Sequence, residues 1–108
     1  MVDKNVLLDE MINKQIKNIN ILEKLTFKEL LRITKNINTS LFGKQCCIWK
    51  GYYIEKKNKK YINFFFHRKK KLLKRLLYVN FIGGLNKKNY IKTTCGNDLC
   101  CNINHIIL

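Results

Sequence analysis

The C-terminal segment carries the side chains with the clearest chemistry, and that chemistry is metal binding. Cys95, Cys100 and His105 are separated by four intervening residues each time, and a fourth soft ligand is available upstream at Cys46 or Cys47. Three thiolates and one imidazole form the closed tetrahedral set that a structural zinc ion prefers, because the protein then fills all four positions. The alternative is a group of free buried thiols with a surface histidine. Four soft ligands in a small basic chain without other crosslinks favour zinc.

The length and the cysteine count limit the class of protein. A chain of 108 residues allows one domain, or a small domain with a helical arm. Its five cysteines would leave one thiol unpaired in any scheme made only of disulfides, which again favours metal. No apolar run approaches the roughly 18 residues of a membrane-spanning helix, and the N-terminus lacks the basic start and apolar core of a secretion signal. We therefore expect a soluble intracellular protein, of the nucleus, the cytoplasm or a virion, with no membrane contact.

The positive charge of the chain is concentrated in one segment. The formal net charge is +15, from 22 basic and 7 acidic residues. Residues 56–97 contain 13 of the basic residues and no acidic one. The abundance of Lys, Asn and Ile is typical of AT-rich genomes, whether viral, plasmid or cellular, but codon usage does not explain where the charge lies. The placement favours an anionic partner such as nucleic acid; the alternative is a solvated face that binds nothing.

The first 45 residues are predicted to form two helices. Apolar residues from Leu8 to Leu22 recur at three- and four-residue spacing, which lines one side of a helix. Thr26 and Glu29 form a capping-box pattern at the start of a second helix, whose apolar residues continue to Ile37. Such a pair most often serves as scaffold, and the alternative is a docking arm for a protein partner.

From Cys46 onward the sequence is typical of strands and short turns. Residues 48–54 and 61–66 are predicted to be the two strands of one hairpin, joined by the charged turn 55–60. Residues 68–80 are predicted to form a short helix that has leucines on one side and basic residues on the other. Gly83 and Gly84 are expected to end this helix, and a further strand is expected at residues 90–94. The predicted fold class is therefore α+β.

The residues around the cysteines resemble those of a known family. The run Cys46-Cys47-Ile48-Trp49-Lys50-Gly51-Tyr52 resembles the opening Cys-aromatic-x-Trp-x-Gly of the zinc-binding HNH (His-Me finger) homing endonucleases. His67-Arg68, followed by residues 72–83, resembles the His-Arg pair that opens a helix in this family. The segment from Thr93 to Ile106 is similar to the family's knuckle, His-x-Cys-x-Asn-x-x-Cys-x-Asn-x-x-His-Leu. Order and spacing agree over about 60 residues, and the first 45 residues lie outside the resemblance.

The resemblance implies a helical arm over residues 1–45 and a zinc-stabilised ββα-type domain over residues 46–108. It implies that Cys46, Cys95, Cys100 and His105 hold the zinc ion, and that Cys47 and Cys101 take apolar positions. The family lays its hairpin on DNA, so nucleic acid, with DNA favoured, is the expected partner. The residues expected to contact it are Lys56, Lys57, Lys59, Lys60, Arg68, Lys70, Lys71, Lys74 and Arg75.

The sequence departs from the nucleases of this family at the residue that activates water. In the family that residue is a histidine two positions before the first knuckle cysteine, and here it is Thr93. A threonine hydroxyl does not act as a base near neutral pH without a base of its own. His67 is the histidine that could substitute, but residues 56–97 offer no carboxylate to hold a catalytic Mg²⁺. The family's divalent-ion ligand lies on a helix after the knuckle, and we expect this helix to be missing.

The sequence therefore predicts a zinc-binding HNH-like module that binds nucleic acid without cutting it, as an accessory to transcription or genome packaging. One alternative is a weak or divergent HNH endonuclease that uses His67. Another is a small structural subunit of a larger nucleic-acid-handling complex, docked through its N-terminal helices. No prediction follows for the oligomeric state.

Overall fold

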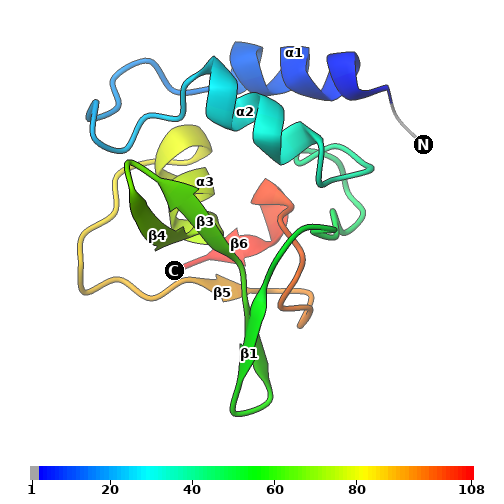
Figure 1. Ribbon diagram of the computed structural model, residues 1–108, viewed down its shortest axis with the longest axis vertical. Helices are drawn as coiled ribbons and strands as arrows, with labels where there is room; N and C mark the ends of the chain where they lie inside the picture. Colours follow the sequence, from blue (N-terminus) through cyan, green and yellow to red (C-terminus); the bar gives the residue numbers. More distant parts are fainter. Residues whose placement is uncertain (1–2) are drawn as a thin grey trace.

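The computed structural model describes residues 3–108 of the chain (Figure 1). These residues contain three α-helices, a short 3-10 helix and three two-stranded antiparallel sheets, joined by loops. The predicted α+β class is confirmed. None of the described helices is long and apolar enough to cross a membrane. The elements, in chain order, are α1 (Lys4–Lys14), α2 (Phe27–Thr34), β1 (Ile54–Lys56), β2 (Lys59–Tyr61), β3 (Asn63–Phe66), β4 (Lys69–Leu72), α3 (Leu73–Phe81), β5 (Lys92–Thr93), η1 (Ile103–His105) and β6 (Ile106–Ile107).

The first helix is shorter than the apolar spacing predicts. It begins after Asp3, whose carboxylate accepts a hydrogen bond from the N–H of Asn5 at 2.7 Å. It ends at Lys14, so the predicted continuation of the helix to Leu22 is wrong. Residues 16–26 form an irregular loop instead.

The buried side chain of Asn80 in α3 explains why this loop leaves the helical path. Its Oδ1 accepts hydrogen bonds from the side chain of Gln15 at 2.7 Å and from the N–H of Leu25 at 2.9 Å. Its Nδ2 donates a hydrogen bond to the carbonyl of Glu23. The backbone carbonyl of Asn80 accepts one from the N–H of Ile16. These long-range bonds satisfy loop groups that would otherwise depend on a continued helix.

The second helix begins where the capping-box pattern predicts. Glu29 accepts hydrogen bonds from the N–H of Thr26 at 2.9 Å and from its hydroxyl at 2.6 Å. The helix ends at Thr34, before the predicted Ile37, whose side chain is nevertheless fully buried.

Two consecutive hairpins replace the single hairpin that the sequence predicts. β1 pairs with β2 so that Lys56 lies opposite Lys59, and the segment predicted as the turn 55–60 is mostly strand. The turn itself is only Lys57-Asn58, with φ angles of 50° and 66°. Two successive left-handed residues are typical of the type I′ turn, whose twist matches that of the paired strands.

The second hairpin takes up the beginning of the predicted helix 68–80. β3 pairs with β4 around the two-residue turn His67-Arg68, whose φ angles are 51° and 63°. His67-Arg68 therefore does not open a helix, and the family-based expectation is wrong here. The helix α3 starts only at Leu73, because residues 69–72 pair with β3.

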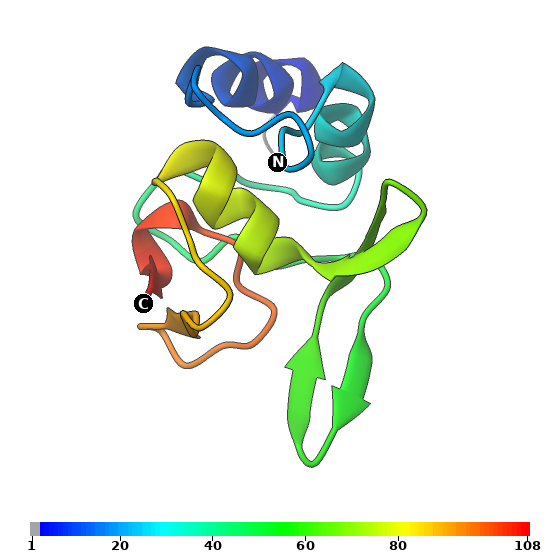
Figure 2. The same ribbon diagram turned by 90° about the vertical axis from the view of Figure 1, so that its left-hand side faces the viewer.

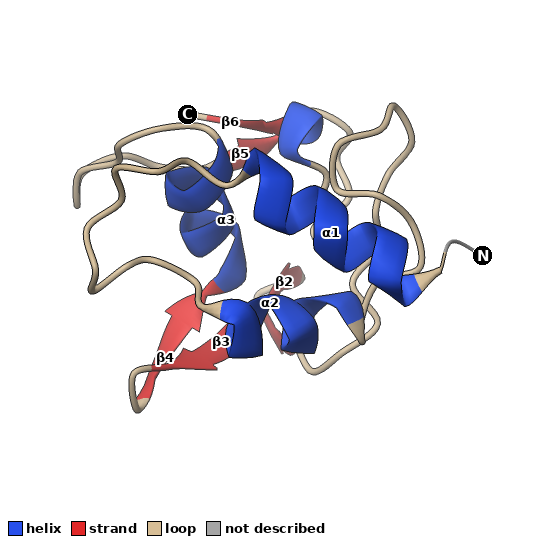
Figure 3. Cartoon of the chain, turned by 90° about the horizontal axis from the view of Figure 1, so that it is seen from above, coloured by secondary structure: helices blue, strands red, loops and turns tan. Residues whose placement is uncertain are grey.

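A shared hydrophobic core joins the N-terminal helices to the rest of the chain. Leu7 and Ile33 from α1 and α2 belong to the same buried cluster as Phe64, Leu77 and Ile103. Figures 1, 2 and 3 show α1 and α2 together over one side of α3. The division of the chain at residue 45 stays a prediction about folding units.

Candidate functional site

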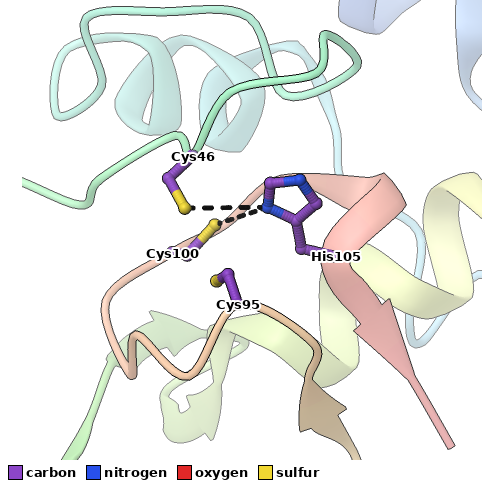
Figure 4. A group of neighbouring side chains, drawn as sticks. All are labelled: Cys46, Cys95, Cys100 and His105. Atoms are coloured by element: carbon purple, nitrogen blue, oxygen red, sulfur yellow. Dashed lines mark hydrogen bonds between the residues drawn. The ribbon is translucent and has the colours of Figure 1, made fainter.

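Four side chains from two distant segments of the chain meet at η1 (Figure 4). They are Cys46, Cys95, Cys100 and His105, the set that the sequence predicts as ligands, and their ligand atoms all lie within 4.8 Å of one another. Nδ1 of His105 lies 3.7 Å from Sγ of Cys46 and 3.4 Å from Sγ of Cys100. This cluster, which we call the metal centre, could hold a metal ion.

A short antiparallel pairing decides which cysteines face the centre. Ile48 and Cys100 form a bridge, and the N–H of Cys101 donates to the carbonyl of Cys47 at 2.7 Å. Because neighbouring residues of an extended chain point to opposite sides, Cys46 and Cys100 face the centre while Cys47 and Cys101 face the core. Both of the latter are fully buried.

The imidazole of His105 is oriented by a backbone carbonyl. Its Nε2 lies 3.0 Å from the carbonyl oxygen of Lys44. Since a carbonyl can only accept, Nε2 carries the proton and Nδ1 presents a lone pair to the thiols. The ring is thus held in the tautomer that a metal ligand needs.

Asn102 holds the two halves of the metal centre together. Its side chain is fully buried and donates to the carbonyls of Gly43 at 2.9 Å and Gln45 at 2.7 Å. Its Oδ1 accepts a hydrogen bond from the N–H of Asn104 at 2.7 Å and thereby caps the N-terminus of η1. Asn102 is not among the site residues that the sequence predicts, although it lies in the knuckle between the candidate ligands Cys100 and His105.

Trp49 and Gly51 explain the spacing of the opening motif. A Cβ at Gly51 would lie 2.8 Å from Cζ2 of the Trp49 indole, closer than real Cβ contacts. The indole N–H donates to the carbonyl of Tyr52 at 3.0 Å. A glycine two residues after the tryptophan therefore lets the chain turn over the ring, next to Cys46.

The thiols of the centre share protons with one another. Hydrogen bonds with Cys95 and Cys100, together with burial, raise the pKa of Cys46 to about 12. Burial opposes the charged form of Cys95, but the Asn97 backbone and the thiols of Cys46 and Cys100 outweigh it, so the pKa of Cys95 falls. A bound cation would replace the thiol protons of this cluster, so metal binding here would release protons.

The predicted nucleic-acid contacts fall into three groups, of which the first is the β1–β2 hairpin. This hairpin projects from the body of the molecule (Figures 1 and 2). Lys56, Lys57 and Lys59 are exposed on it. Lys60 is half-buried, with Nζ 5.6 Å from the ring centre of Tyr53.

The second group lies on the β3–β4 hairpin. Arg68 is exposed in the turn and Lys70 is exposed on β4, while Nζ of Lys71 lies 5.8 Å from the ring centre of Phe66. The expectation that Lys70 and Lys71 share a helix face with Lys74 is wrong, because the first two belong to a strand.

The third group, Lys74 and Arg75 on α3, is held by internal hydrogen bonds. The ammonium of Lys74 donates to the carbonyl of Asp98. The guanidinium of Arg75 donates to the carbonyls of Asn89 at 2.7 Å and Asn86 at 3.0 Å. These donors are therefore committed to the loops on either side of α3.

Thr93 and His67 lie in different parts of the molecule. Thr93 is half-buried in β5, opposite Ile106, and lines a cleft of about 740 Å³. His67 is exposed in the β3–β4 turn, with its ring 4.0 Å from that of Phe66. It is not among the described residues that line the cleft.

Comparison with known proteins gives one informative similarity. The chain is 45% identical over 108 residues to the uncharacterized protein R328 of Acanthamoeba polyphaga mimivirus, a match that covers 95% of this chain and 32% of that protein. The chain thus spans about a third of the length of this viral relative. No family model matches the chain, and no solved structure matches it.

Proposed function

We propose that this chain is a zinc-stabilised, HNH-like module that binds nucleic acid, with DNA favoured, and does not cut it. It would act as an accessory to transcription or genome packaging. The observation that carries the proposal is a projecting basic hairpin on a chain whose Cys/His cluster can hold a metal ion.

Zinc is supported by the donor set and by its distances. Bonds of about 2.3 Å to sulfur and about 2.0 Å to nitrogen, at tetrahedral angles, separate a sulfur from a nitrogen by about 3.5 Å. The two sulfur-to-Nδ1 distances in the metal centre are 3.4 and 3.7 Å. Three thiolates also favour zinc over Mg²⁺ or Ca²⁺, which bind oxygen.

Nucleic acid is supported by the form of the β1–β2 hairpin. Lys56, Lys57 and Lys59 are exposed on a thin projection, where they can approach phosphates without moving the core. Glu55 is the acidic residue on this hairpin, and it precedes the lysines. Lysine contacts of this kind provide affinity with little reading of base sequence.

The absence of cleavage is supported by Thr93, which takes the family's histidine position beside the cleft. His67 is exposed on a separate turn and has no carboxylate hydrogen-bonded to orient it. Mg²⁺-dependent nicking that disappears in His67→Ala would contradict this part of the proposal and favour the divergent endonuclease.

Fluorescence anisotropy across salt concentrations tests nucleic-acid binding. With six to ten phosphate contacts, affinity for a 20-bp duplex should fall about a thousandfold or more between 50 and 200 mM salt. A flat salt dependence, or the absence of binding at 50 mM, would contradict the proposal.

A structural subunit is a second candidate because apolar side chains are exposed on the N-terminal part. Ile21 is 81% exposed, Leu22 65% and Phe27 60%. Of the stripe predicted from Leu8 to Leu22, Leu22 contributes to this surface, whereas Leu8 and Met11 are buried in the core. Size-exclusion chromatography of the purified chain tests this candidate, because a monodisperse monomer would count against it.

A further inference from the structure

The cleft that contains Thr93 lies beside the projecting hairpin and shares its strand β2, whereas Lys56 and Lys57 of that hairpin lie outside the lining. Its walls come from β2, the start of α3 and the segment that runs from Lys87 to Thr93. Figure 2 shows this segment descending from the end of α3 to β5. The volume of about 740 Å³ lies within the range of small-ligand pockets, about 300 to 1,000 Å³.

The charge of the lining favours an anionic ligand. Asp98 is the acidic residue in the lining, and its carboxylate already accepts a hydrogen bond from the N–H of Lys60 at 3.1 Å. The basic residues of the lining are Lys59, Lys60, Lys74, Arg75, Lys87 and Lys92. The lining thus carries six basic residues and one carboxylate, and this excess of positive charge favours a phosphate.

Arg75 gives the outer wall a defined position. By donating to the carbonyls of Asn86 and Asn89, it ties this loop to α3. The loop carries Lys87 and leads directly to Tyr90. The backbone that carries Lys87 and leads to Tyr90 is thus tied to α3 beside the cleft.

The lining of the cleft also contains apolar and aromatic side chains. Tyr61 and Tyr90 line it together with Ile62, Leu72 and Ile91. The ring of Tyr90 is 82% exposed, although a large aromatic side chain gains free energy when it is covered. An aromatic ring beside lysines is the combination that binds an unpaired base and its phosphate.

We propose that this cleft binds one nucleoside phosphate unit, with its base stacked on Tyr90 and its phosphate near Lys87 and Lys92. This inference rests on the proposed function in taking nucleic acid as the source of the unit. A base inside a duplex has its faces covered by its neighbours, so the nucleotide must be free, or must belong to a single-stranded or locally opened strand. The hairpin and the cleft then select different forms of nucleic acid.

Matched variants separate the two surfaces. The probes are a labelled dT10 strand and a labelled 20-bp duplex, titrated with the full chain carrying its metal. Tyr90→Ala should weaken dT10 binding by about 5- to 150-fold, because one stacked base is lost, and should leave duplex binding within twofold. Tyr52→Ala removes another exposed tyrosine, which lies outside the cleft lining, and should leave dT10 binding within twofold.

Charge reversals provide a second comparison at equal net charge. The cleft variant combines Lys87→Glu with Lys92→Glu, and the hairpin variant combines Lys56→Glu with Lys57→Glu, at positions outside the cleft lining. The cleft variant should weaken dT10 binding at least fivefold more than the hairpin variant. The order should be reversed for the duplex. Since all four lysines are exposed, circular dichroism is expected to show an unchanged fold in both double variants.

Competition with dTMP identifies the source of the nucleotide. If dTMP displaces dT10 from the unchanged protein but not from Tyr90→Ala, the cleft binds a free nucleoside phosphate. Persistence of dT10 binding in the presence of dTMP, with the Tyr90→Ala effect intact, assigns it to a nucleotide within a strand.

The same data distinguish failure of this inference from failure of the proposed function. Two results would overturn the cleft assignment. One is an equal loss of dT10 affinity in Tyr90→Ala and Tyr52→Ala. The other is that the same double variant weakens binding more for both probes. Salt-dependent duplex binding would in that case still support the hairpin. Failure of both probes to bind would overturn both proposals.

Discussion

The metal centre and the β1–β2 hairpin differ in how their residues are held. At the metal centre, hydrogen bonds hold the residues in place: the carbonyl of Lys44 orients His105, and the buried Asn102 ties the two ligand segments together. On the hairpin, Lys56, Lys57 and Lys59 are exposed, and the two strands pair only with each other. We infer that changes at the centre act on stability, whereas changes on the hairpin act on binding.

Loss of the metal is expected to have the largest effect. The purified chain should contain one zinc ion, and Cys95→Ser should remove it and unfold the protein, because structural zinc contributes about 10–16 kcal/mol in zinc-finger peptides. Few domains of this size are stable by more than about 15 kcal/mol. Metal analysis by mass spectrometry and thermal unfolding measure the two outcomes.

Cys95 is the informative ligand because its side chain is exposed. Without a metal, an exposed Cys→Ser change would alter the free energy of unfolding by less than about 0.5 kcal/mol. Cys101→Ala is the matched control, since it removes a buried thiol that faces the core and should retain the metal. A stable, folded Cys95→Ser variant would show that the centre has no role in stability.

Asn102→Ala is expected to have the next largest effect. It leaves the carbonyls of Gly43 and Gln45 without the buried Asn102 donor, which should cost about 2–4 kcal/mol of unfolding free energy in urea denaturation. Asn104→Ala is the control, because its exposed amide bonds can be replaced by water and its loss should cost less than about 1 kcal/mol. Equal losses in the two variants would argue against a special role for Asn102.

The double change Lys56→Glu with Lys57→Glu should affect binding and leave stability alone. Duplex affinity at 100 mM salt should fall at least about tenfold, and the salt slope should become shallower by about 2, since two phosphate contacts are removed. The melting temperature should stay within about 2 °C, because neither side chain is buried.

A matched pair controls for net charge in that experiment. Lys17→Glu with Lys24→Glu changes two exposed lysines of the loop between α1 and α2 by the same amount. This pair should leave duplex affinity within about threefold. If both pairs weakened binding equally, net charge rather than the hairpin would control the affinity.

Asn58→Gly should have the smallest effect. Asn58 has a φ angle of 66°, which glycine adopts without strain, so the turn is kept. The free energy of unfolding should change by less than about 0.5 kcal/mol, and duplex affinity should stay within twofold, because no charge is altered. A large loss of stability would mean that the hairpin is coupled to the core more closely than its sheet pairing indicates.

The predictions from sequence succeeded where a local pattern specifies a local structure. The capping box of Thr26 and Glu29 began α2 as expected, since its partners are three residues apart. They failed where distant groups compete for the backbone. Asn80 ended the helical path expected to reach Leu22, and the pairing of β4 with β3 delayed α3 to Leu73.

By itself the sequence determined the α+β class, the types and spacing of the four candidate ligands, and the concentration of charge in residues 56–97. These follow from covalent order and side-chain chemistry. Only the tertiary structure decided that the predicted basic residues divide among two hairpins and α3, and that Thr93 lies in a basic cleft which does not include His67. The physical reason is that long-range hydrogen bonds and strand pairing determine where each helix and turn ends. Local residue spacing does not encode these interactions.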